Sequence, residues 1–466
     1  PRGKMIGGCS SHNGMVFVRG HAEDFNRWSK NGLSKWSYRH VLPYFKKLET
    51  SLEGESQYRG KNGLLQVSKS KINEKFPLFQ AALNAAVEAG YPISEDFNGY
   101  MQDGFGTYDL TIKDGMRIGA AKAYLQDTKQ RKNVEIFIKT NVQKILFENL
   151  KAIGIQIMIK GKLENIYANK EVIVSSGSIN SPKLLQLSGI GDEHELRQLG
   201  IEVTHHLPGV GKNLQDHLEI YVQHESKTSD TLYSLFNNPF LKVFSGIQWF
   251  LSKKGLLAHS HLELGGFVKS DARFDHPNIQ LHFFPALVIN HGLTNPDRHA
   301  FQFHASPNRP TSRGWVKLRS SNPEEDPVIQ FNYLETEEDR LQMRDCVKIA
   351  RNVFSQKSFQ HYAGKELRPG KNVQDNDVLD EIIRNTSDTA YHPSCTNKMG
   401  DDKFSVVNNE TKVHGISNLR VIDSSIMPDI VSGNINAATL MIAEKASDII
   451  LGREEEAIDV DIFSTA

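Results

Sequence analysis

One stretch constrains the fold more than any other, because it has the pattern of a buried strand that runs directly into a helix. Residues 171–176 are mostly apolar and β-branched, as in a central strand of an α/β sheet. In the segment that follows, Ser181 fits a helix N-cap, Pro182 the first helical position and Gly189 the helix end. Nucleotides bind at such strand–turn–helix junctions, although the pattern also fits an ordinary β–α connection.

Further apolar runs predict more strands. They indicate three more strands, at residues 134–138, 142–147 and 152–159. The tail repeats the buried-strand pattern at 419–423 and is expected to rejoin the same sheet. Short helices are predicted at 36–48, with Ser37 as N-cap, and at 117–125.

The pattern changes after about residue 225, where a second domain is expected to begin. Strands are predicted at 279–284 and 314–319, and helices at about 336–356 and 375–385. A chain of 466 residues is long enough for two hydrophobic cores. The expected fold class is α/β (α+β). Its parts are a discontinuous cofactor domain (1–50, 115–225 and 405–453), loops and a lid over the cofactor (51–114), and a substrate domain (226–404).

Charge and cysteine content argue against several classes of protein. The 55 basic residues balance the 55 acidic ones, so nucleic acid is not an indicated partner. The three cysteines, Cys9, Cys346 and Cys395, have neither metal-ligand spacing nor a disulfide pattern, so no metal site is predicted. No apolar run reaches the roughly 18 residues of a membrane-spanning helix. Residues 240–251 are predicted to form a helix lying on a core, with a helix on a membrane surface as the alternative.

His392 is the first candidate for a general base, because histidine takes up and returns a proton near neutral pH. Pro393 fixes its own φ and favours an extended conformation at His392, so the ring would project from a stiff backbone. Taken alone, the residue fits an inert histidine in a turn. Downstream, however, Asn434 and Asn436 precede an apolar helix, and this combination favours an active site.

A loop near the N-terminus packs small and hydrogen-bonding residues together, in the order Gly7-Gly8-Cys9-Ser10-Ser11-His12-Asn13-Gly14. Glycines let a backbone approach a planar or phosphorylated ligand closely, and exposed N–H groups can bind its oxygens. By itself such a loop is weak support for a cofactor site.

Taken together and in this order, the motifs resemble the glucose-methanol-choline (GMC) family of FAD-dependent alcohol oxidoreductases over essentially the whole chain. The anchors are GKMIGGCSSHNGMVFVRGHAEDFNRW, GSINSPKLLQLSGIG, PGVGKNLQDHLE, YHPSCTNKMG and NLRVIDSSIMPDIVSGNINAATLMIAEKASDII. The resemblance implies a Rossmann-like FAD domain and a substrate domain with a large, mostly antiparallel sheet and covering helices. The family's first strand and Gly-x-Gly-x-x-Gly turn have no counterpart here, so we expect either a partial sequence or poor FAD binding.

Within this family the chain is most similar to choline-oxidising members. That similarity implies oxidation of choline to betaine aldehyde, a step of glycine betaine synthesis, by hydride transfer to flavin N5. His392 matches the family's active-site histidine and Asn434 its partner, which cannot titrate and is expected to orient the alcohol oxygen. His392 either removes the hydroxyl proton or starts protonated and stabilises the alkoxide.

The resemblance also assigns substrate and cofactor contacts. Glu263 is expected to neutralise the substrate cation and Tyr391 to wall its pocket, with a solvated strand glutamate as the alternative for Glu263. His12 is either bonded covalently to the flavin 8α-methyl or packed beside the dimethylbenzene ring. The implied cofactor contacts are Gly7, Gly8, Ser10, His12, Asn13, Gly14, Met15, Val16, Val142, Asp423 and Asn436, the last also capping the helix that follows.

Several alternatives stay open. The electron acceptor is either a quinone or dioxygen, and the substrate either choline or another primary alcohol. Two hypotheses assign a function other than alcohol oxidation. One is a lyase on the same scaffold, and the other is an inactive or partial flavin-binding fragment. The resemblance implies a mitochondrial protein associated with the inner membrane in an animal, and a membrane-associated or cytoplasmic one in a bacterium. Peripheral membrane association without a transmembrane span is expected.

Overall fold

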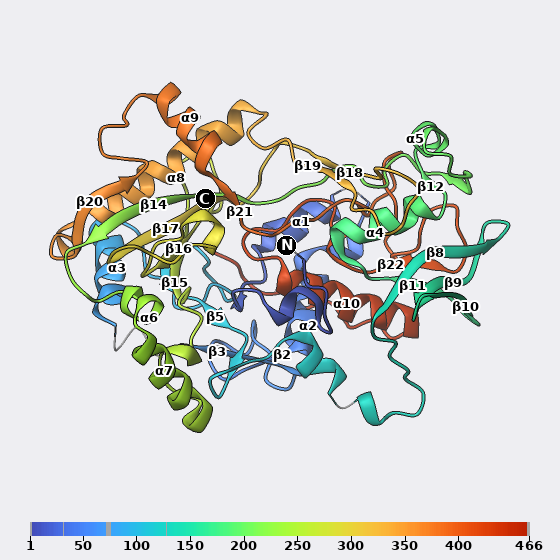
Figure 1. Ribbon diagram of the computed structural model, residues 1–466, viewed down its shortest axis with the longest axis horizontal. Helices are drawn as coiled ribbons and strands as arrows, with labels where there is room; N and C mark the ends of the chain where they lie inside the picture. Colours follow the sequence, from blue (N-terminus) through green and yellow to red (C-terminus); the bar gives the residue numbers. More distant parts are fainter. Residues whose placement is uncertain (1, 31, 71–75, 127, 464–466) are drawn as a thin grey trace.

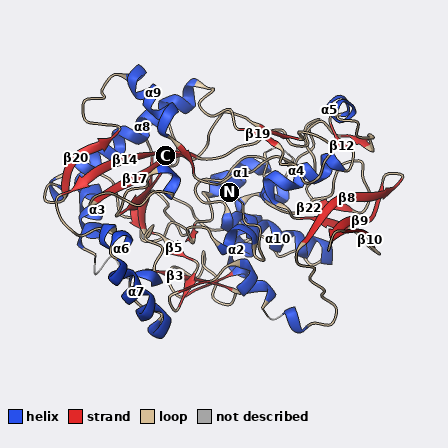
Figure 2. Cartoon of the chain, in the orientation of Figure 1, coloured by secondary structure: helices blue, strands red, loops and turns tan. Residues whose placement is uncertain are grey.

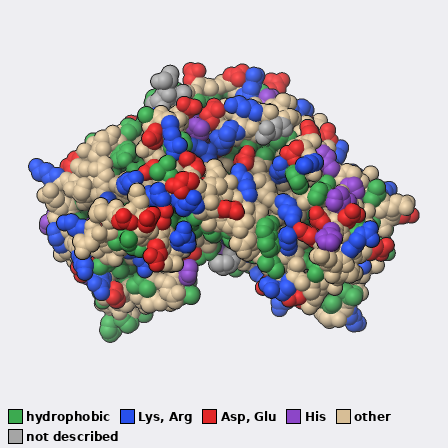
Figure 3. Space-filling model, turned by 90° about the horizontal axis from the view of Figure 1, so that it is seen from above, with side chains coloured by type: hydrophobic (Ala, Val, Ile, Leu, Met, Phe, Trp, Pro, Cys, Tyr) green, Lys and Arg blue, Asp and Glu red, His purple; other side chains and the backbone are tan. Residues whose placement is uncertain are grey.

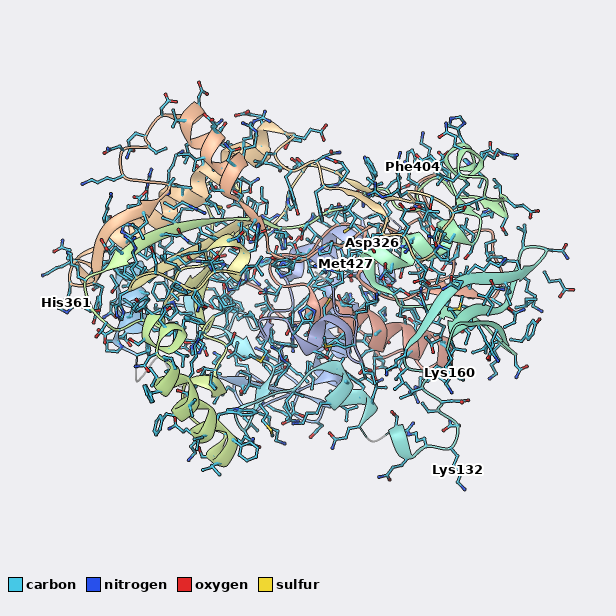
Figure 4. The ribbon with its side chains drawn as sticks, in the orientation of Figure 1. Lys132, Lys160, Asp326, His361, Phe404 and Met427 are labelled. Atoms are coloured by element: carbon cyan, nitrogen blue, oxygen red, sulfur yellow. The ribbon has the colours of Figure 1, made fainter. Side chains whose placement is uncertain are left out.

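The computed structural model describes residues 2–30, 32–70, 76–126 and 128–463, which form two lobes around a helical centre (Figure 1). Strands gather at both ends of the molecule, and helices α1 (Ala22–Ser29), α2 (Tyr38–Leu48) and α10 (Asn436–Leu451) lie between them (Figure 2). Met427 is fully buried and lies near the middle, between the two lobes (Figure 4).

A seven-stranded antiparallel sheet forms one lobe, in the order β20-β14-β17-β16-β15-β4 with β21 beside β14. The strands are β4 (Gly104–Thr107), β14 (Leu218–Ser226), β15 (Leu264–Val268), β16 (Ile279–Phe284), β17 (Ala300–Pro307), β20 (Ala363–Arg368) and β21 (Asp388–Thr389). Helices α3 (Pro77–Glu88), α8 (Glu337–Ser355) and α9 (Asn376–Thr386) share one hydrophobic core with this sheet. The expected antiparallel sheet with covering helices is confirmed.

The other lobe contains the parallel pair β11 (Val172–Val174) and β22 (Leu419–Val421), so the tail rejoins the first sheet as predicted. Beside them lies an antiparallel meander of β8 (Thr140–Glu148), β9 (Lys151–Ile159) and β10 (Lys162–Tyr167). The strand expected at 134–138 is wrong. Its apolar side chains lie exposed in an extended loop, because no strand in the described part of the chain runs beside them to complete a ladder.

The helix after β11, α4 (Gly177–Leu187), begins earlier than the sequence predicts, so Ser181 is not its N-cap and Pro182 lies inside it. A proline nitrogen cannot donate to the carbonyl four residues earlier, that of Ser178. The Thr396 hydroxyl donates to this carbonyl instead, at 2.6 Å. The Asp423 carboxylate accepts from the Gly177 N–H at 2.9 Å and the Ser181 hydroxyl at 2.5 Å. A tertiary contact therefore lets the helix continue across its proline.

Smaller elements complete the chain. Strands β1 (Val16–Phe17), β5 (Asp109–Leu110), β3 (Leu65–Lys69) and β2 (Glu49–Ser51) form a four-stranded sheet. Three short pairs are β6 (Ile112–Lys113) with β7 (Met116–Arg117), β12 (Ile190–Gly191) with β13 (His205–His206), and β18 (Trp315–Lys317) with β19 (Val328–Gln330). The remaining helices are α5 (Glu193–Gln198), α6 (Tyr233–Asn237) and α7 (Pro239–Ser252).

Two local expectations need correction. Residues 51–114 are not loops alone, because they also contain α3, β3, β4 and β5, and β4 belongs to the large sheet. The helix predicted at 117–125 is a single π-turn, Ala121–Leu125. Strand β14 extends the large sheet back to Leu218, ahead of the expected start of the substrate domain. The exact domain boundaries stay a prediction.

We expected the apolar side of α7 to lie on a core. The structure shows that side exposed instead. Its inner side presents Leu241, Ser245 and Trp249, and Ser245 is the buried residue of this helix. The opposite face carries six exposed apolar side chains, among them Phe240, Phe250 and Leu251 at 85%, 72% and 77% exposure. The helix is too short to cross a bilayer, and among the residues described no helix is both long and apolar enough to do so.

Candidate active site

A hydrogen-bond chain defines the state of His392. Nε2 of His217 lies 2.9 Å from the backbone oxygen of Asn308, and a carbonyl oxygen can only accept, so this nitrogen carries a hydrogen. Nδ1 of neutral His217 is then bare and accepts from Nδ1 of His392, 2.9 Å away. Nε2 of His392 is then the bare nitrogen, and its lone pair accepts from the Asn434 amide N–H at 3.2 Å.

The other end of the chain leads to the same assignment. The Tyr108 hydroxyl donates to the backbone oxygen of Leu281 at 2.8 Å, so its own oxygen is the acceptor for the Gln280 amide at 3.4 Å. The Gln280 amide also donates to Oδ1 of Asn434 at 3.2 Å, which directs the Asn434 N–H towards His392. Two backbone carbonyls therefore fix the direction of every donor between them.

The electrostatic setting agrees with a neutral His392. Burial, and then His217 and His282, hold the pKa of His392 well below its usual 6.5. Burial lowers the pKa of His217 to about 4 and that of His282 to about 3. At neutral pH the three rings are uncharged, so Nε2 of His392 is available to accept a proton.

Buried carboxylates hold the two loops that present His392 and Asn434. The Asp216 carboxylate accepts from the His392 N–H at 2.8 Å and from the Thr389 hydroxyl at 2.5 Å. Burial raises the pKa of Asp216 to about 6. The Asp24 carboxylate accepts from the Ser432 N–H at 2.7 Å and its hydroxyl at 3.0 Å, two residues before Asn434. Both catalytic candidates are thus anchored through their own backbone segments.

Glu263 lies directly before β15, the strand that pairs with β16, and β16 carries Gln280 and His282. Its side chain is fully buried. Oε1 accepts from the Ser260 N–H at 3.1 Å, whereas Oε2 has no hydrogen-bond partner among the described residues. Burial raises the pKa of Glu263 to about 7, against backbone and Ser70 hydrogen bonds that lower it. A buried carboxylate with one unused oxygen fits a cationic ligand and is not the solvated strand glutamate that was the alternative.

The glycine loop abuts this segment. The Ser260 hydroxyl donates to the backbone oxygen of Gly14 at 2.5 Å, and a Cβ at Gly14 would lie 3.1 Å from Leu262. Inside the loop, Gly7 and Gly8 have positive φ, and the Arg117 guanidinium donates to the Asn13 side chain at 2.6 Å. The Ser10 hydroxyl accepts from the Ala120 N–H at 2.9 Å. His12 is exposed at the end of this turn.

Three residues predicted to contact the cofactor have surroundings that differ from the expected ones. Both oxygens of Asp423 are already used, by Gly177, Ser181 and Ser425, so Asp423 anchors the start of α4. Asn436 does not cap α10, because it is the first helical residue and Ile435 is the N-cap. Val142 lies on β8, in the opposite lobe from the large sheet (Figure 1). Tyr391 precedes His392 at an exposed position with φ of 63°, and its role as a wall of the substrate pocket stays a prediction.

The residues present fit a flavin. Helix α10 begins two residues after Asn434, and within the described part of the chain no side chain caps its first N–H groups. These groups and the helix dipole suit an electron-rich ring that gains negative charge on reduction. The Gly7–Gly8 turn leaves space beside Gly8, where a Cβ would meet no atom within 4 Å. Asn434, the α10 N-terminus and the loop from Gly7 to Gly14 are the groups that would hold the ring.

The sequence interpretation missed His217, Gln280, His282 and Asp216. Asp216 and His217 were visible as an Asp-His pair after a Gly/Pro-punctuated loop, but nothing local indicated what they face. Gln280 and His282 alternate with apolar residues on β16, and only the pairing with β15 brings them to the site.

Comparison with known proteins finds relatives along most of the chain. Two family models described as GMC oxidoreductase match the chain, one over residues 1–219 and one over 310–443. Mitochondrial choline dehydrogenase of Homo sapiens is 50% identical over 455 residues, which is 97% of this chain and 76% of that protein. Oxygen-dependent choline dehydrogenase of Vibrio vulnificus is 45% identical and covers 97% of this chain and 81% of that protein.

Solved structures share the architecture. A formate oxidase superposes with a TM-score of 0.90 at 25% identity, covering 97% of this chain and 84% of that one. Pyridoxine 4-oxidase from Mesorbium loti superposes with a TM-score of 0.87 at 26% identity, covering 97% and 85%. With family models over more than half of its residues and relatives at this level of identity, the chain belongs to the GMC oxidoreductase family.

Proposed function

We propose that this FAD-dependent oxidoreductase oxidises choline to betaine aldehyde. The observation that carries the proposal is Glu263, a fully buried carboxylate with an unused oxygen, directly before the strand that pairs with the one bearing Gln280 and His282. A quaternary ammonium group cannot donate a hydrogen bond, so it is recognised by fixed negative charge and aromatic surfaces. The relatives at 45–50% identity are named as choline dehydrogenases, which supports the same substrate.

The proposed roles follow from the hydrogen-bond chain. The Asn434 N–H donates to the alcohol oxygen, and Nε2 of His392 takes the hydroxyl proton as the carbonyl forms. FAD, when bound, supplies the acceptor for the hydride that leaves the α-carbon. The lowered pKa of His392 favours a histidine that begins neutral and acts as the base over one that begins protonated. Glu263 binds the cation and Tyr391 lines its pocket.

An anaerobic titration tests the substrate. Choline is added to the full-length, FAD-loaded protein, and the flavin absorbance is followed. We expect choline to bleach the flavin, and 3,3-dimethylbutan-1-ol, its uncharged isostere, to require at least tenfold higher concentration because Glu263 gains nothing from it. An enzyme for uncharged primary alcohols would treat the two alike. If choline leaves the flavin oxidised, the proposed substrate is wrong.

Two further points are separate proposals. The electron acceptor is proposed to be a quinone, and admitting oxygen after reduction tests this, because rapid reoxidation by dioxygen would identify an oxidase. A covalent bond between exposed His12 and the flavin is tested by acid precipitation, since flavin left in the supernatant excludes it. The human and mouse relatives are named as mitochondrial, and a mitochondrial location is proposed here only for an animal source.

A further inference from the structure

Helix α7 carries an apolar stripe on the side that faces away from the protein. Its exposed members are Phe240, Val243, Phe244, Ile247, Phe250 and Leu251. Their spacing of three and four residues places them on one helical face. A soluble helix normally has the reverse arrangement, with its apolar side inward. The exposed stripe is therefore a surface built for contact with something apolar.

Within the stretch of chain that forms α7 and its flanks, the charged side chains are all of one sign. Residues 231–262 contain three lysines, Lys242, Lys253 and Lys254, and neither aspartate nor glutamate. Lys253 lies over the Trp249 ring at 4.0 Å and ends the helix in the left-handed conformation. Lysine stems can lie along an apolar layer while the ammonium groups reach a polar one, and anionic headgroups attract them.

The way α7 projects from the molecule favours contact with a flat lipid bilayer over contact with a protein that binds the helix in a groove. Figure 1 shows α7 projecting with α6 at the edge of the large-sheet lobe. Figure 3 shows the molecule from above, where acidic and basic side chains are mixed over the surface and hydrophobic ones form small groups. A second copy joined through the same face would set lysines against lysines, whereas an anionic bilayer supplies the opposite charge.

We propose that α7 lies in the headgroup region of an anionic lipid bilayer, with its apolar stripe among the upper acyl chains. The helix is joined to the rest of the protein in two ways. The Trp249 indole N–H donates to the backbone oxygen of Gly115 at 2.8 Å, and the chain after α7 leads through Ser260 to Glu263. The bilayer therefore meets the same lobe that carries the proposed cation site. The inference identifies the surface for the expected membrane association, and it holds whatever alcohol is oxidised.

Vesicle sedimentation tests the proposal with the full-length, FAD-loaded protein. We expect it to sediment with vesicles of equal parts phosphatidylcholine and phosphatidylglycerol, and less with phosphatidylcholine alone. The double variant Phe244→Ser/Phe250→Ser should bind about tenfold more weakly or worse. Lys242→Gln/Lys254→Gln should lose the preference for the anionic lipid, at about fivefold for each lysine. The matched control is Leu163→Ser/Tyr167→Ser on exposed positions of β10, which should bind like the parent.

Several outcomes would overturn the inference. One is no sedimentation with either vesicle, and another is equal binding by the parent and the Phe244→Ser/Phe250→Ser variant. A third is a variant that changes from dimer to monomer in sedimentation velocity while its lipid binding stays the same, which would assign the stripe to contact between copies. Flavin bleaching by choline is measured separately for the Phe244→Ser/Phe250→Ser variant. Loss of lipid binding is thereby distinguished from failure of the proposed substrate.

Discussion

Glu263 combines two roles that oppose each other at the scale of one residue. The unused oxygen that suits a cation also makes the empty site unfavourable when the carboxylate is ionised. Burial raises the pKa of Glu263 to about 7, so its folded-state pKa exceeds the unfolded one. Its contribution to stability is therefore complete below about pH 4.3 and is lost as the pH rises through about 7.

Glu263→Gln should consequently stabilise the substrate-free protein at alkaline pH. We expect its unfolding free energy at about pH 8 to exceed that of the parent by up to about 3 kcal/mol, with a smaller difference at about pH 5. Urea unfolding at both values measures this. Glu164→Gln, at an exposed position of β10, is the control and should change little. An equal effect of Glu263→Gln at both pH values would show that ionisation is not responsible.

His217 is a positioning residue for His392, and its role depends on offering an acceptor at Nδ1. His217→Leu removes that acceptor, so His392 is free to place its proton on Nε2. The rate of flavin reduction should fall by about 100-fold or more, as expected when a general base is disabled. His217→Gln should restore most of the rate, because its amide can accept from His392 and donate to Asn308 at once. Stopped-flow reduction by choline measures both.

A merely structural role for His217 predicts a different pattern. Loss of rate in His217→Leu and His217→Gln alike, with unchanged thermal stability in the glutamine variant, would contradict the tautomer assignment. The pH profile of reduction gives a second readout, since a misplaced proton changes the apparent pKa that governs the rate.

At the scale of elements, α4 shows why a local pattern can predict the wrong helix start. Serine before proline is a good N-cap pattern, and the sequence interpretation used it. The helix instead begins at Gly177, since Asp423 binds its first turn and Thr396 serves the carbonyl that Pro182 leaves free. Both partners are more than 200 residues away in the chain. No local signal could have indicated them.

Thr396→Val tests the contact that carries α4 across its proline. It leaves the Ser178 carbonyl buried without a donor, which should lower the unfolding free energy by about 1–3 kcal/mol. Pro182→Ala supplies a helical N–H to the same carbonyl, so the double variant should regain most of this loss. Thr386→Val on α9, whose hydroxyl serves only its own helix, is the control. Additive losses in the double variant would refute the explanation.

For the whole molecule, acid should weaken the fold through its buried histidines. Burial lowers the pKa of His21 and His217 to about 4 and that of His282 to about 3, and His392 is held well below 6.5. Their stabilising contribution is complete above about pH 6.5 and is lost as the pH falls towards their folded pKa values. Glu263 and Asp216, with raised pKa values, take up protons in the same range and offset part of the loss.

We therefore expect the unfolding free energy to fall by several kcal/mol between about pH 7.5 and about pH 5, because neutral histidines outnumber the opposing carboxylates. Urea unfolding across this range provides the measurement. His282→Gln should flatten the dependence, since glutamine does not titrate. A stability that rises on acidification would show that the carboxylates dominate.

The sequence predicted the two-lobe architecture and the pair His392 and Asn434 because their motifs are contiguous. It predicted Glu263 through resemblance, and burial with an unused oxygen then gave that residue a physical reason. His217, Gln280 and His282 were not predicted, since strand pairing and loop packing bring them to the site. The face of α7 that packs against the protein was predicted wrongly. Periodicity identifies an apolar face, but it does not show on which side of the helix the rest of the protein lies.

The two backbone carbonyls that end the hydrogen-bond chain have a consequence for how such a site can change over time. Side chains at its middle positions can be exchanged, but the acceptors of Leu281 and Asn308 belong to the main chain and survive any substitution there. The backbone therefore determines which nitrogen of His392 accepts the proton, whatever side chains are exchanged. Substrate preference is free to drift around it through residues such as Glu263, while the proton-accepting end keeps pointing the same way.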